Sequence, residues 1–77
     1  MEEARQYEAE AWRRRGNESY GEGKWGEARI LYDQSISIKD TAAARANRAA
    51  ATLKLGDDIE GALQVRRRRE EDEGLTG

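Results

Sequence analysis

The chain has 77 residues, of which 36% are hydrophobic and 39% are charged, and its net charge is −2. A sequence of this length allows one small domain, which is marginally stable unless its packing is very regular or it associates. The chain has no cysteine and no histidine, which excludes disulfides and thiolate zinc sites and removes most general bases, so we expect no enzyme, no metal and no cofactor.

The first predicted helix covers residues 2–20. Its two leading glutamates suit the positive end of a helix dipole. Trp12 and Gly16 are four residues apart and therefore share one helical face. We expect Trp12 to be a large packed ring and Gly16 to let a neighbouring backbone approach closely.

A turn rich in glycine separates this helix from a second one, predicted over residues 25–38. Gly23 suits the left-handed residue that ends a helix. The segment 21–26 matches the spacing G-x-G-x-x-G, but a dinucleotide site needs a strand before the glycines, and a helix precedes them here. The second helix has an apolar stripe at helical spacing, formed by Ala28, Leu31, Tyr32, the small Ser35, Ile36 and Ile38.

The remaining chain predicts two more helices. Asp40 and Thr41 are an N-cap signal before an alanine-rich run, and the third helix is expected to end near Leu55, with Gly56 as its stop. A fourth helix is expected from about Asp58. Its apolar residues are Ile59, Ala62, Leu63 and Val65. We expect it to fray before Glu73.

Few β-branched residues are present and none alternates with polar ones, so the fold class is all-α, built from antiparallel helix-turn-helix pairs. Two copies are expected to stack, because Gly16 and Gly23 superpose on Ala49 and Gly56, each 33 residues later. The predicted divisions are an extension (1–8), a first repeat (9–41), a second repeat (42–73) and a disordered tail (74–77). No apolar run approaches the roughly 20 residues of a membrane span, and the acidic N-terminus is not a signal peptide. A soluble, cytoplasmic chain is expected.

Trp12, Gly16, Ala28 and Tyr32 stand at the spacing of a known pattern, and on these residues the chain resembles the tetratricopeptide repeat. Arg15 replaces the usual leucine, Tyr20 comes one residue late, and Asp40 replaces the closing proline. The resemblance implies stacked helical hairpins that bind peptides.

The candidate site consists of Arg13, Asn17 and Asn47. Arg13 and Asn17 are one turn apart, and Asn47 would point into the same concave face if the third helix packs parallel to the first. A guanidinium and two carboxamides suit the binding of carboxylates. The alternative interpretation is that the three are ordinary polar surface residues.

The segments Gly16-Asn17 and Asn47-Arg48-Ala49-Ala50 are similar to the signatures of the dicarboxylate-clamp subfamily. Its members are co-chaperones that hold the acidic Glu-Glu-Val-Asp tails of the 70 and 90 kDa heat-shock chaperones. Arg13 stands where that subfamily has a lysine. The resemblance therefore implies an adaptor with Arg13, Asn17, Tyr20 and Asn47 as peptide-binding residues.

The sequence lacks two parts of the family's clamp, and this leaves three alternatives. The clamp draws two further basic residues from a third repeat and is covered by an extra helix, so the sequence is part of a larger domain, self-associates, or is an engineered or decayed repeat. The function could then be a self-associating or designed scaffold without a specific peptide. Nucleic-acid binding through 13–15 and 66–69 is disfavoured, since acids follow the second run and no aromatic residues interleave.

Overall fold

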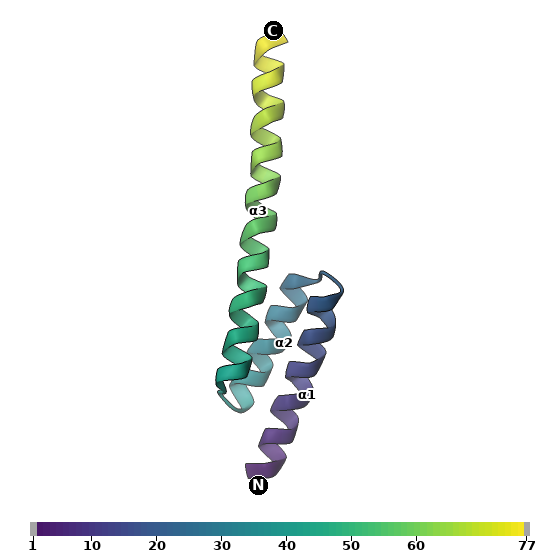
Figure 1. The fold of residues 1–77 in the computed structure, drawn as a ribbon, viewed down its shortest axis with the longest axis vertical. Coiled ribbons are helices and arrows are strands. Elements are labelled where there is room, and N and C mark those ends of the chain that lie inside the picture. The colour runs from purple at the N-terminus through teal and green to yellow at the C-terminus, as the bar shows by residue number, and fades with distance from the viewer. Residues whose placement is uncertain (1, 77) are drawn as a thin grey trace.

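The computed structural model describes residues 2–76, except for the side chains of residues 60–62 and 64–76. It contains three helices, α1 (Glu2–Gly21), α2 (Trp25–Ile38) and α3 (Ala42–Thr76), and no strand among the described residues (Figure 1). The all-α class and the first helix-turn-helix pair are therefore confirmed. The first two helices begin where the sequence predicts, and α1 ends one residue later than expected.

The turn between α1 and α2 is closed by backbone hydrogen bonds. The N–H of Lys24 donates to the carbonyl of Ser19 at 2.9 Å, and that of Gly23 donates to the carbonyl of Tyr20 at 3.0 Å. This pair of bonds defines a Schellman C-cap, whose C′ residue takes the left-handed conformation. Gly23 has φ of +79°, which confirms the predicted role of this glycine.

The start of α3 is capped as the sequence predicts. The backbone N–H of Ala44 donates to the Oγ1 atom of Thr41 at 3.2 Å, which is the N-cap geometry. Arg45 donates to both carboxylate oxygens of Asp40, at 2.6 and 2.5 Å. These bonds lower the pKa of Asp40 below its usual value.

The helix break expected after Leu55 is wrong, because α3 continues unbroken through Gly56 to Thr76. Gly23 is the only glycine with positive φ among the described residues, so Gly56 keeps an ordinary helical backbone. A lone glycine costs a helix only about 1 kcal/mol, whereas closing a second hairpin requires enough apolar surface to offset the chain entropy. Ile59 and Leu63 offer little apolar surface for such a hairpin. The predicted tail positions 74–76 belong to α3, and Gly77 lies outside the described residues.

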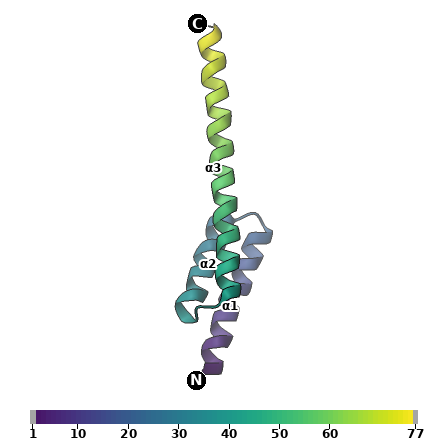
Figure 2. The same cartoon turned by 60° about the vertical axis from the view of Figure 1, so that its left-hand side comes forward.

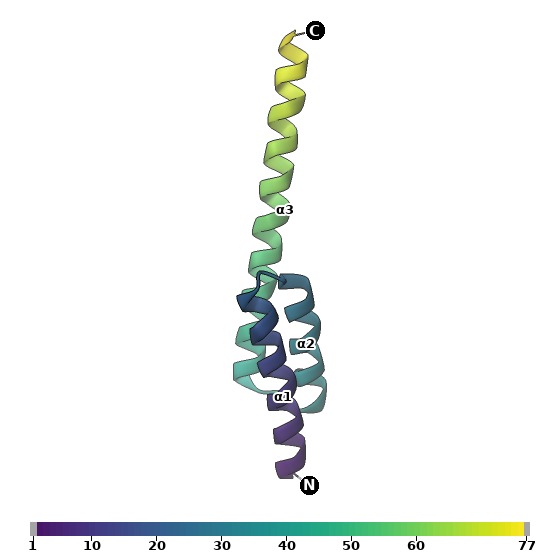
Figure 3. The same cartoon turned by 90° about the vertical axis from the view of Figure 1, so that its right-hand side faces the viewer.

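The hairpin of α1 and α2 covers only the first half of α3. The second half of α3 extends beyond the α1–α2 turn in all three views (Figures 1, 2 and 3), and the molecule measures 67 × 18 × 13 Å. Within the part of the chain described, no helix is both long and apolar enough to cross a membrane.

The core is small and lies where the three helices meet. Tyr32 of α2 is 1% exposed and clusters with Ala28 and with Ala51 of α3, and Tyr20 packs against this cluster. Ser35, also buried, donates a hydrogen bond to the carbonyl of Ala9 at 2.7 Å, so its hydroxyl is satisfied inside the interface of α1 and α2.

Two expectations about α1 need correction. Trp12 is half-buried, with the guanidinium of Arg15 4.7 Å from its ring centroid, and Tyr32 is the large side chain in the core instead. Gly16 does admit a close neighbour, but the neighbour is this ring and not a backbone. A Cβ at Gly16 would lie 2.5 Å from Cε1 of Tyr32, so only glycine fits there without displacing the ring.

Candidate functional site

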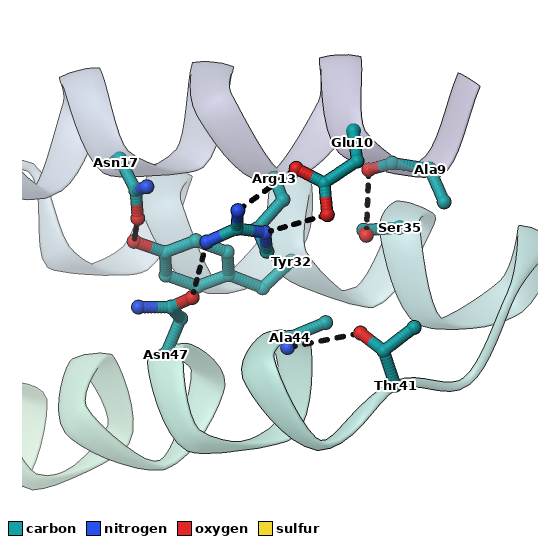
Figure 4. Close-up of polar contacts among 9 residues, drawn as sticks. All are labelled: Ala9, Glu10, Arg13, Asn17, Tyr32, Ser35, Thr41, Ala44 and Asn47. Atoms are coloured by element: carbon teal, nitrogen blue, oxygen red, sulfur yellow. Dashed lines mark hydrogen bonds and ion pairs between the residues drawn. The ribbon is translucent and has the colours of Figure 1, made fainter. Parts of the chain in front are cut away.

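Arg13 and Asn47, which are 34 positions apart in the sequence, meet across α1 and α3. The Nη1 atom of Arg13 donates to the Oδ1 atom of Asn47 at 3.2 Å (Figure 4). The structure thus brings together two of the residues that the sequence predicts as a site. The contact exists because α3 packs on α2 close enough to bring its first turns beside α1.

Arg13 is also held by Glu10, a residue that the sequence reasoning missed. The Nη2 and Nε atoms of Arg13 donate to the two carboxylate oxygens of Glu10, at 2.8 and 3.4 Å. These bonds lower the pKa of Glu10 and raise the pKa of Arg13. The spacing of three residues on one helix is a common ion-pair spacing, so the signal was present in the sequence.

Asn17 lies on the same side of α1 but has a different partner. Its Oδ1 atom accepts a hydrogen bond of 2.6 Å from the hydroxyl of Tyr32 (Figure 4). Burial raises the pKa of this Tyr32 hydroxyl above its usual value, so the tyrosine stays a donor at neutral pH. Asn17 is exposed, and this contact fixes the orientation of its side-chain amide.

The hydrogen bonds leave a defined set of donors for a ligand. Asn17 and Asn47 each use the amide oxygen toward the protein, so both NH₂ groups remain as donors. A guanidinium has five N–H bonds, and Arg13 uses three of them, which leaves two. The side chain of Arg13 is 23% exposed and that of Glu10 is 37% exposed, so an anion can reach them.

Tyr20 is not brought to Arg13 and lies further along α1, at the level of the turn. Its ring makes an edge-to-face contact with Trp25, with centroids 4.9 Å apart. The ammonium of Lys54 lies 5.7 Å from the centroid of the Trp25 ring. Lys54 is seven residues after Asn47, or about two turns, so both lie on one face of α3. Sequence reasoning missed this second cation.

Of the two arginine runs in the sequence, only the first is described with its side chains. The basic run 13–15 is not a continuous patch, because Arg13 pairs with Glu10 and Arg15 lies over Trp12. The side chains of the run 66–69 lie outside the described residues. In the described part of the chain, no group of three or more acidic side chains is placed to hold a metal ion.

Comparison of the chain with protein-family models, with curated proteins and with solved structures finds no match.

Proposed function

We propose that this chain is a protein-interaction module of the tetratricopeptide-repeat type, which binds acidic C-terminal peptides such as the tails of heat-shock chaperones. The observation that carries the proposal is the contact between Arg13 on α1 and Asn47 on α3, with Asn17 beside it. One cation and two amide NH₂ groups lie on one face, and charge-assisted hydrogen bonds of this kind are the strong ones for a carboxylate.

The peptide would lie along α1 and α3. Its terminal carboxylate accepts hydrogen bonds from the two remaining N–H groups of Arg13 and from the NH₂ of Asn47 or Asn17. Lys54 lies two helical turns further on, roughly 10 Å along the helix axis. An extended peptide covers this distance in about three residues, so a second acidic side chain three positions before the C-terminus would reach Lys54.

Glu10 makes the binding weak. Its carboxylate already neutralises Arg13, and an incoming carboxylate competes with it for the guanidinium. With one cation shared in this way and a second one distant, we expect a Kd on the order of 1 mM, or about −4 kcal/mol. Replacing Glu10 by glutamine should tighten binding by a factor between about 1.4 and 5, since an exposed ion pair is worth about 0.2–1 kcal/mol.

The test is an NMR titration of the labelled chain with the peptide Met-Glu-Glu-Val-Asp. Shifts are expected at Arg13, Asn17 and Asn47, and they should weaken in Asn47→Ala and Asn17→Ala. Arg14→Ala is the matched control, because Arg14 is an exposed neighbour of Arg13. The same peptide with an amidated C-terminus should bind much less. Equal shifts with the amidated peptide, or none with either peptide at several millimolar, would reject the proposal.

The second candidate function is a self-associating scaffold without a specific peptide. It is favoured by the exposed aliphatic side chains of α3, which include Leu53 at 71% and Ile59 at 60% exposure. An exposed row of this kind on a small, highly charged protein indicates an interaction surface. The two functions are compatible if the surfaces differ.

A further inference from the structure

One face of α3 carries apolar residues on both sides of Gly56. Leu53 and Ile59 are each three residues from this glycine, and Ala49 and Leu63 are each seven residues from it. At 100° per residue these positions lie within one band of the helix surface. Leu53, Ile59 and Leu63 are 71%, 60% and 46% exposed. The pattern reads alike in both directions from Gly56.

A surface hollow begins this band beside α2. It is lined by Ile36 of α2 and by five residues of α3, which are Arg45, Arg48, Ala49, Thr52 and Leu53. Arg48 forms an ion pair of 2.5 Å with Asp33 of α2. The hollow therefore combines apolar and basic side chains at the junction of two helices, and the band of α3 continues from it past the end of the hairpin.

The geometry points to a second copy of this chain as the occupant, bound through an antiparallel pairing of the two α3 helices centred on Gly56. In this pairing Leu53 packs against Ile59 of the second copy, and Ala49 packs against its Leu63. The glycines face each other at the twofold axis, where the lack of a side chain allows close approach. In the single chain nothing lies within 4 Å of a Cβ built at Gly56, so the position is free for this contact.

The charge order of the sequence favours the antiparallel direction over the parallel one. The acidic run 70–73 is fourteen to seventeen residues after Gly56, and the segment 39–42 is at the same distance before it. That segment contains Lys39 and the start of α3, which is the positive end of its helix dipole, together with Asp40, which falls at the level of Asp72. In a parallel pairing the acidic runs of the two copies would meet each other and repel.

The pairing leaves the candidate peptide site open. Asn47 is nine residues before Gly56, which is two and a half turns, and so lies on the opposite side of α3. Ala44 and Ala51, which are 0% exposed, are on that side as well and pack on the hairpin. Self-association and peptide binding therefore use different faces, and failure of one leaves the other unaffected.

The mass of the full chain is the first test. Sedimentation equilibrium should show a limiting mass of twice 8.7 kDa as concentration rises. Leu53→Glu should weaken association roughly tenfold or more, since it places a charge at the centre of a helix interface. Tyr7→Glu is the matched control, because Tyr7 is equally exposed at 75% but lies on α1. It should associate like the unmodified chain.

Disulfide trapping then fixes the register, since the chain has no cysteine of its own. Ala49→Cys and Leu63→Cys should cross-link to each other when the two variants are mixed and oxidised, and neither should cross-link well alone. A chain carrying both substitutions should give intermolecular bonds. Cross-linking of Ala49→Cys with itself would indicate a parallel pairing. A monomeric mass, with the doubly substituted chain closing on itself, would show that α3 folds back at Gly56 instead. Either result, or no cross-link, overturns the proposal.

Discussion

The two halves of α3 are both helical, but only the first half is part of a packed core. Ala44 and Ala51 near the start of the helix are fully buried, whereas Leu53, on the opposite face, and Ile59 and Leu63 further along are exposed. The small residues are buried because Tyr32 of α2 fills the space beside Ala51. Burial in this molecule therefore follows the fit of a large side chain against small ones, and not the hydrophobicity of each residue alone.

The largest expected effect tests the centre of the packed half. Tyr32→Ala removes the one large side chain that is almost fully buried among the described residues and should cost about 3–5 kcal/mol. This is comparable to the whole stability of a domain of this size, so urea denaturation should show a largely unfolded hairpin. Tyr7→Ala is the control, because its ring is 75% exposed, and it should change the free energy of unfolding little. Equal losses in the two variants would mean that the core is elsewhere.

Gly16→Ala is expected to have the next largest effect. The new Cβ would meet Cε1 and Cδ1 of Tyr32 at 2.5 and 2.6 Å, and such overpacking costs about 1–3 kcal/mol. The loss should appear even though alanine is the better helix former by about 1 kcal/mol. In the Tyr32→Ala background the same change should be neutral or stabilising, because the clash is gone. A double-mutant cycle measured by thermal unfolding gives this coupling.

Tyr32→Phe tests the hydroxyl that ties the core to the candidate site. At pH 7 the loss of the bond to Asn17 should cost about 0.5–1.5 kcal/mol. Burial raises the pKa of Tyr32 in the folded chain. Such a tyrosine contributes its full stabilisation of the folded state at pH values below its unfolded pKa of about 10. This stability is lost as the pH rises through the folded pKa. The unmodified chain should therefore lose stability more steeply than Tyr32→Phe above about pH 10. Parallel alkaline melting curves would contradict this account.

Local signals in the sequence were enough for the first two helices but not for the third. The end of α1 and the start of α3 depend on Gly23 and Thr41, whose effects act within one turn. Gly56 resembles Gly23 in the sequence, yet whether a glycine ends a helix depends on what the returning segment can bury. The surface that a returning segment can bury depends on the whole chain. The segment after Gly56 has few apolar residues, so the local sequence does not show whether the helix ends there.

The candidate site was predicted in part for the same reason. The repeat spacing placed Arg13 and Asn47 on facing helices, and their contact was found. The spacing does not show that Tyr32 reaches Asn17 from α2, since that contact needs the crossing of α1 and α2. The pair of Glu10 with Arg13 is local, but Glu10 is also four residues from Arg14, so the spacing alone does not single out the partner.

The smallest expected effect returns to the unpacked half of α3. Gly56→Ala places a Cβ where nothing lies within 4 Å, so in the dilute single chain it should only favour the helix, by about 0.5–1 kcal/mol. Circular dichroism should show higher helicity and a higher melting temperature, opposite in sign to Gly16→Ala. At high concentration Gly56→Ala should weaken self-association, because the methyl group separates two helices that meet at Gly56. A loss of helicity in the dilute chain would mean that Gly56 adopts a backbone conformation that alanine does not tolerate. The helix would then end at Gly56, as the second hairpin requires, and α3 would not be continuous.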